Sequence, residues 1–174
     1  MRRLWIVLLA AATGCAQPPT KELEMTADRV ARAQAVEADV YAKESYQAAE
    51  TALGEARQLL TERDYGAAVQ AASLASTRAD EAYTRALLGK QRMTRLARRQ
   101  LLEIVSLVEE TRSWGVPARE TESLEALTER LGVLERELER GAAASVYEQG
   151  TRLKNDALDF LNRLKAGKVD ERLT

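Results

Sequence analysis

Apolar residues that recur with a helical period are the feature that most constrains the fold of this chain. From Val30 onward they return at steps of three and four, and charged or polar residues fill the positions between them. This spacing places the apolar residues on one face of an α-helix. Only three prolines occur, and two of them, Pro18 and Pro19, precede the pattern. The chain is therefore expected to be all-α, with long helices and few interruptions.

Interruptions of the pattern predict about four helices. Asp64 suits the N-cap of the second helix, Pro117 suits the first position of the third, and Gly141 suits the end of the third. We expect the helices to form two antiparallel hairpins, the first one longer. The expected helices cover roughly residues 21–63, 65–112, 118–140 and 142–166.

Alanine dominates the first predicted hairpin, 21–112, and leucine the second, 118–166. Alanine lets two helix axes approach closely but buries little apolar area, so we expect the leucine-rich part to be more stable. Residues 167–174 are expected to form a flexible tail. In the second helix the alanine stripe shifts register near Gly89, so that helix either bends or breaks there. The residues expected to face inward after the shift are Met93, Leu96, Leu101, Ile104 and Val108.

The two halves of the chain resemble each other at a separation of about 78 residues. The shift places Leu53 on Leu131 and Leu60 on Leu138. A duplicated helical unit and a chance match between two amphipathic hairpins both explain this pattern at the level of sequence.

Composition excludes several functional classes. The chain has no histidine and one cysteine, so it lacks the commonest metal ligand and cannot form an internal disulfide. With 26 basic and 27 acidic residues, nothing favours nucleic-acid binding. No nucleophile elbow, phosphate loop, dinucleotide fingerprint or paired-cysteine motif occurs. We expect no catalytic activity, no metal, no cofactor and no small-molecule substrate.

The N-terminal segment has the shape of a secretory signal peptide, with Arg2 and Arg3, nine apolar residues and a small-residue exit. Nine helical residues cover about 13 Å, too little to span a hydrocarbon core of about 30 Å. The order Ala-Thr-Gly ending at Cys15 resembles a bacterial lipobox, which implies removal of residues 1–14, acylation of the Cys15 thiol and a tether over 15–20. Cleavage by the ordinary signal peptidase after Ala16 is the alternative.

Lipidation implies a place in the cell as well as an anchor. Two or more acyl chains suffice for stable membrane attachment, whereas one is marginal. By the sorting pattern of enterobacterial lipoproteins, Ala16 after the acylated cysteine implies the periplasmic face of the outer membrane of a diderm bacterium.

The stretch from Pro19 to Ala86 resembles a family of alanine-rich helical bacterial lipoproteins that contain a domain of unknown function. The family occurs alone or ahead of OmpA-like peptidoglycan-binding domains. Where the family turn has glycine this chain has Arg63, and where the family has proline it has Lys43, so the first helix is expected to continue past that point. The pattern is also similar to a tetratricopeptide-like helix pair, which implies a partner-binding scaffold. The resemblance rests on Tyr41-Ala42, Ala49, Leu53, Ala56, Leu60, Arg63-Asp64-Tyr65, Ala68, Ala72, Ala75 and Ala79.

Arginines form a stripe along the second predicted helix. Arg78, Arg85, Arg92 and Arg99 are spaced by seven, which places them on one helix face. Arg95 belongs to the run from Lys90 to Arg99, which contains five basic residues and no acidic one. They either pair with acids of a neighbouring helix, such as Glu37, Glu44, Glu120 or Glu122, or bind an external anion. The arginine stripe consists of Arg78, Arg85, Arg92, Arg95 and Arg99.

Together these features predict a lipid-anchored structural or interaction protein of the cell envelope. Its expected partners are the membrane, through Cys15, and an envelope protein or further copies of the chain. The alternative is a binding module for anionic lipid, lipopolysaccharide or glycan that uses the arginine stripe.

Overall fold

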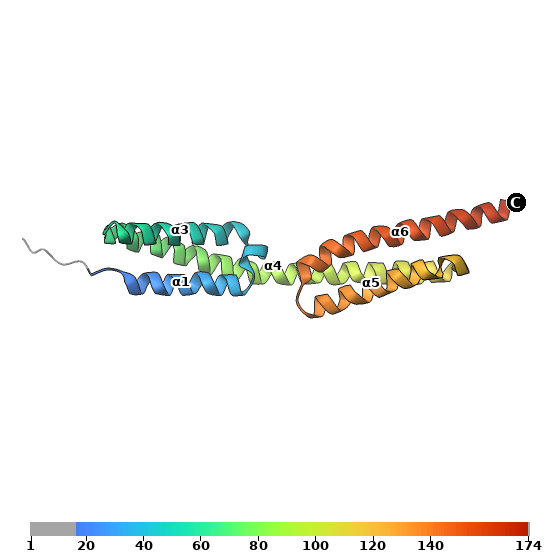
Figure 1. The fold of residues 1–174 in the computed structure, drawn as a ribbon, viewed down its shortest axis with the longest axis horizontal. Coiled ribbons are helices and arrows are strands. Elements are labelled where there is room, and N and C mark those ends of the chain that lie inside the picture. Colours follow the sequence, from blue (N-terminus) through green and yellow to red (C-terminus); the bar gives the residue numbers. More distant parts are fainter. Residues whose placement is uncertain (1–16, 174) are drawn as a thin grey trace, which may run out of the picture. The chain divides into compact units, whose positions relative to one another are not determined.

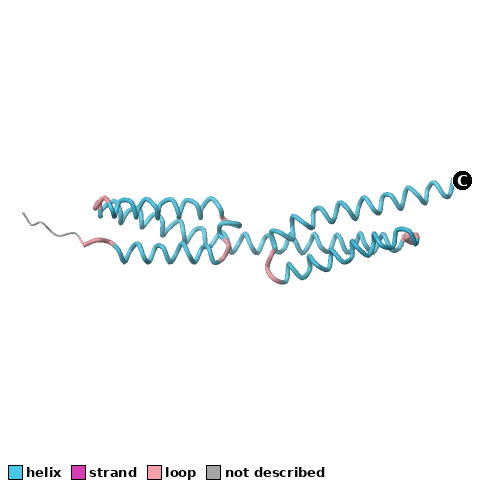
Figure 2. Tube along the Cα trace, viewed as in Figure 1, coloured by secondary structure: helices cyan, strands magenta, loops and turns pink. Residues whose placement is uncertain are grey.

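The computed structural model describes residues 17–173, with side chains as far as Lys168. All regular structure in this range is helical, which confirms the all-α class (Figures 1 and 2). None of its helices is both long and apolar enough to cross a membrane. The elements are α1 (Thr20–Ala35), α2 (Ala38–Tyr41), α3 (Lys43–Thr61), α4 (Tyr65–Ser113), the 3-10 turn η1 (Ala118–Glu120), α5 (Thr121–Glu139) and α6 (Ala143–Leu173).

The prediction of four helices is wrong, because the first one is interrupted. Helix α1 ends at Ala35, and Glu37 adopts a left-handed conformation with φ of 63°. The chain then reverses through α2 into α3. A single helix could not fold its two apolar segments onto each other, whereas the reversal buries Leu23 on α1 and Ala56 on α3 in one cluster. Burial of both segments outweighs the cost of the left-handed residue, which is about 1–2 kcal/mol.

Two helices continue through a glycine: a bend or a break was expected at Gly89, and a helix end just before Gly167. Helix α4 continues through Gly89, and α6 continues through Gly167 as far as Leu173. Glycine inside a helix costs only about 1 kcal/mol relative to alanine. The expected helix end at residue 166 is therefore wrong, and the predicted flexible tail is helical up to Leu173.

The chain divides into two compact units, one ending at Thr84 and the other beginning at Arg85. Unit 1 contains α1, α2, α3 and the first part of α4, whereas unit 2 contains the rest of α4, η1, α5 and α6 (Figure 1). In each unit three long helices share a core, so each is a three-helix bundle where a two-helix hairpin was expected.

Helix positions in the two units correspond at a separation of 78 residues. Lys43 and Thr121 begin α3 and α5, and Thr61 and Glu139 end them. Tyr65 begins α4, and the corresponding residue, Ala143, begins α6. By the same shift, α1 corresponds to the last part of α4. Helix α4 is therefore the third helix of one repeat and the first helix of the next.

Backbone conformation follows the same shift. Four residues of the described chain have positive φ, and they form two corresponding pairs, Glu37 with Gly115 and Arg63 with Gly141. After α3 the Asp64 N–H donates to the Leu59 carbonyl, and after α5 the corresponding bond runs from Ala142 to Glu137. Both turns are Schellman motifs. Agreement in helix bounds, turns and positive-φ positions shows that the similarity of the halves is a structural repeat and not a chance match.

Corresponding positions are buried in both repeats but hold residues of different size. Alanine predominates in the first repeat and larger residues in the second, so one fold is packed in two ways. The buried pairs on α3 and α5 are Tyr46/Leu124, Ala49/Leu127, Leu53/Leu131 and Ala56/Leu134. Those on α4 and α6 are Ala68/Val146, Ala72/Gly150, Ala75/Leu153, Ala79/Ala157, Ala82/Phe160 and Ala86/Leu164.

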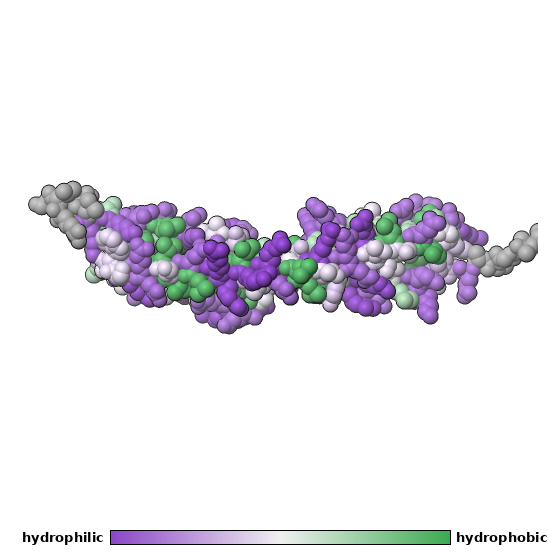
Figure 3. Space-filling view, turned by 180° about the vertical axis from the view of Figure 1, so that it is seen from behind, coloured by the Kyte–Doolittle hydropathy of each residue, from purple (hydrophilic) through white to green (hydrophobic). Residues whose placement is uncertain are grey.

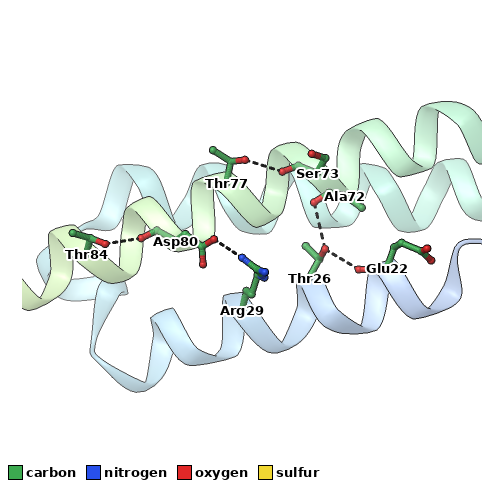
Figure 4. A network of polar contacts seen from close by, with 8 residues as sticks. All are labelled: Glu22, Thr26, Arg29, Ala72, Ser73, Thr77, Asp80 and Thr84. Carbon is green, nitrogen blue, oxygen red and sulfur yellow. Dashed lines mark hydrogen bonds and ion pairs between the residues drawn. The ribbon is translucent and has the colours of Figure 1, made fainter.

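In each unit a polar side chain lies against the neighbouring helix beside corresponding residues, Ala72 in unit 1 and Gly150 in unit 2. In unit 1 the buried Thr26 hydroxyl lies 2.8 Å from the Glu22 carbonyl and 3.3 Å from that of Ala72 (Figure 4). In unit 2 the Gln100 side chain lies 2.7 Å from the Thr151 hydroxyl. It fills the space beside Gly150, where an added Cβ would lie 2.9 Å from its Oε1 atom. These contacts fix the register of α1 against α4 and of α4 against α6.

Exchanging core residues between the repeats tests the two packings. Ala75 and Leu153 correspond, and both are fully buried. We expect Ala75→Leu to destabilise unit 1 by about 1–3 kcal/mol through overpacking. We expect Leu153→Ala to destabilise unit 2 by about 2–5 kcal/mol through a cavity. Chemical unfolding followed by circular dichroism measures both effects.

The control is Ala48→Leu, at an exposed position of α3. It should change stability by no more than about 0.5 kcal/mol. Stabilisation by Ala75→Leu would mean that the helices of unit 1 are not closely packed.

Candidate functional site

All five residues of the arginine stripe lie exposed on α4, as their spacing predicted. Arg78 and Arg99 pair with acids of the same helix. The guanidinium of Arg78 is 2.9 Å from the Glu81 carboxylate, and that of Arg99 is 3.4 Å from Glu103. Because both pairs are exposed, each contributes at most about 1 kcal/mol and leaves the arginines available to other anions.

Arg92 and Arg95 are the least neutralised part of the stripe. Among the side chains between residues 17 and 168, no carboxylate pairs with either of them. They lie in a segment of α4 that has no acidic residue between Glu81 and Glu103. This segment is a local concentration of positive charge in a chain that is nearly neutral overall.

Two leucines that the sequence analysis did not single out share this side of α4. Leu88 is 61% exposed and Leu102 is 64% exposed. Counting from Leu88, the steps to Arg92, Arg95, Arg99 and Leu102 are four, three, four and three, which is the helical period. We call these five residues the Leu/Arg face. The same helical period in the sequence is the signal that identifies this face.

The register shift expected near Gly89 is only partly right. Leu101, Ile104 and Val108 are buried, but Leu96 is 41% exposed. None of residues 87–96 is buried. In the space-filling view, strongly hydrophilic side chains adjoin hydrophobic ones along the middle of α4 (Figure 3).

Glu103 connects the Leu/Arg face to α6. Its carboxylate accepts a hydrogen bond of 2.6 Å from the Lys154 ammonium and also pairs with Arg99. The hydrogen bond from Lys154 is the main cause that lowers the pKa of Glu103, and attraction to Lys154 and Arg99 adds to it. Glu103 therefore stays ionised and limits the positive charge at the Leu102 end of the face.

A groove lies between α5 and α6. It has a volume of about 350 Å³ and includes Ser123 and Asp159. Arg130 on its wall pairs with Asp156 at 2.7 Å. The chain has no histidine to act as a base for the serine, and within the described residues no acidic or cysteine side chains cluster as metal ligands would.

The pKa of Glu103 generates a prediction about stability. A lowered pKa in the folded state stabilises the fold above the unfolded value, near pH 4.3, and this contribution disappears as pH falls through the folded pKa. We expect Glu103→Gln to be less stable than the parent at neutral pH and equally stable in strong acid. Urea unfolding at a series of pH values measures this.

Glu129→Gln is the control, since it removes one exposed carboxylate from α5. If the two variants showed the same pH profile, the effect would be one of net charge and not of the contact with Lys154.

Comparison with known proteins gives no match to a family model, to a curated protein or to a solved structure. The resemblance to helical lipoproteins stays a prediction. Cys15 and the signal segment 1–14 lie outside the described residues.

Proposed function

We propose that the chain is a lipid-anchored scaffold protein of the cell envelope, without catalytic activity. The observation that carries the proposal is the sequence of residues 1–15, in which a signal-like segment leads to the only cysteine. The anchor attaches the two three-helix units to the periplasmic face of the outer membrane, where their surfaces bind an envelope protein or further copies of the chain.

The helical body supports a binding role. The described helices expose long polar faces, and many charged side chains there are engaged in surface ion pairs, such as Arg29 with Asp80 at 2.5 Å in unit 1 (Figure 4). Helical repeats offer extended surfaces to partners. The analogy with tetratricopeptide-like helix pairs points the same way, although fold alone does not determine function.

The exposed charge of Arg92 and Arg95 favours a second candidate function, a module that binds anionic ligands. Arginine is suited to this role because its planar guanidinium donates paired hydrogen bonds to phosphate or carboxylate. Lipid, lipopolysaccharide and glycan ligands are possible occupants of such a module.

Mass spectrometry of the mature protein from a diderm host tests the anchor. We expect an N-terminal Cys15 that carries acyl chains, and we expect Cys15→Ser to move the protein from the membrane fraction to the soluble fraction. A mature chain that begins unmodified at Gln17 would contradict lipidation.

Crosslinking in the same cells tests the scaffold. The acylated protein should give a defined crosslinked species, either with one envelope protein or with itself, and Cys15→Ser should reduce its yield. Crosslinking spread over many abundant proteins, unchanged by the substitution, would contradict a specific scaffold.

A further inference from the structure

We propose that the Leu/Arg face of α4 docks on an anionic phospholipid membrane surface. The proposal deepens the second candidate function, on which it rests, by naming the ligand and the residues that bind it. The face consists of Leu88, Arg92, Arg95, Arg99 and Leu102.

The five residues form one continuous strip. At 100° per residue they fall within an arc of about 80°, and the 14 residue steps from Leu88 to Leu102 extend for about 21 Å along the helix. The opposite side of α4 in this unit holds Ala97, Leu101 and Ile104, which are buried in the core with α5 and α6. The core therefore holds the strip on the outside of the bundle.

Charge identifies the chemistry of the ligand. Three arginines lie side by side, and Arg92 and Arg95 at the centre have no carboxylate partner among the described side chains. Lipid phosphates are spread over a membrane surface, so a row of guanidinium groups can contact several of them at once. Each basic residue near an anionic leaflet contributes about a fivefold increase in affinity, which corresponds to about 1 kcal/mol.

The leucines distinguish a membrane from a soluble anion. They are the two most exposed large apolar side chains among the residues for which exposure is described, and they lie at the two ends of the arginine row. A free phosphate or a glycan would leave both leucines in water. A membrane interface accepts apolar side chains below the level of the phosphates that bind the arginines.

Shape and surrounding charge favour the membrane over a second copy of the chain. The strip runs as a ridge along a single helix, and at one end of it Leu102 borders a groove of about 280 Å³ between α4 and α5. That groove also carries Arg98, Glu135 and Glu139, so acidic side chains limit the positive surface at this end of the strip. A flat and deformable surface fits the ridge without a complementary shape.

The test measures the fluorescence of a label attached at a single position of the full chain. Cys15→Ser removes the only native cysteine and the acylation site, so an environment-sensitive fluorophore can be attached at Leu88→Cys. The matched control position is Val133→Cys on α5, which is 39% exposed in the same unit but lies off the face. Vesicles of phosphatidylcholine, with or without phosphatidylglycerol, are the probe.

With vesicles that contain phosphatidylglycerol, and only with these, we expect the fluorescence emission of the label at position 88 to shift to the blue. We also expect a quencher attached to the lipid acyl chains to reduce that emission. The label at position 133 should not respond. When Arg92, Arg95 and Arg99 are all changed to glutamine, the lipid concentration needed for the same response at position 88 should rise roughly a hundredfold. The control, with Arg119, Arg136 and Arg140 changed to glutamine, loses equal charge and should keep the response.

Three results would overturn the proposal. They are equal responses at 88 and 133, a response at 88 to phosphatidylcholine alone, and a response without lipid that grows with protein concentration. The last would identify a second copy as the occupant. Because every protein in the test lacks the acylation site, none of these results bears on the anchor, which mass spectrometry tests separately.

Discussion

Both units depend on the burial of one side of α4. Buried alanines from Ala68 to Ala86 complete the core of α1 and α3. Larger buried residues on the same side of α4, among them Leu101, Ile104 and Val108, complete the core of α5 and α6. Two amphipathic helices alone leave part of their apolar faces in water, and a third helix covers them. Helix α4 is therefore the one helix that contributes to both cores.

The repeat shows how one backbone plan accepts two kinds of core. In unit 1 the small residues, among them Ala79 and Ala82, let the helices approach closely. In unit 2, Leu153 and Phe160 fill the corresponding space with larger side chains. Larger side chains bury more apolar area per residue, at about 25 cal/mol per Å². The turns differ as well, because Arg63 occupies a left-handed position that Gly141 takes without steric cost.

Periodicity predicted the helical class and most core positions, because burial of a helix face leaves a direct trace in the sequence. Asp64 also caps α4 as predicted, since its carboxylate accepts a hydrogen bond of 3.1 Å from the Ala67 N–H. The reversal after Ala35 left no such trace. Glu37 takes the left-handed position there, whereas the corresponding turn has Gly115 followed by Pro117. A charged residue in that conformation is held by tertiary packing and cannot be recognised from local sequence.

The sequence predicted the arginines of the candidate site but not its leucines. Arginines spaced by seven stand out in a sequence, so the stripe was found. Exposed leucines look like core residues until the structure shows which side of the helix is covered. Leu96 was assigned to the core for this reason, and Leu88 and Leu102 were overlooked. Lipidation of Cys15 stays a prediction from the sequence, because acylation is carried out by enzymes that recognise the segment before the cysteine.

Native-state hydrogen exchange along α4 tests the shared-helix account most directly. The account predicts two protected blocks, near residues 68–86 and 97–111, with the leucine-packed block opening at the higher free energy. Amides of residues 87–96, which have no buried side chain, should exchange faster than either block. Uniform protection that is lost in a single opening from residue 68 to residue 111 would contradict the account, because it would mean that α4 belongs to one core and not to two.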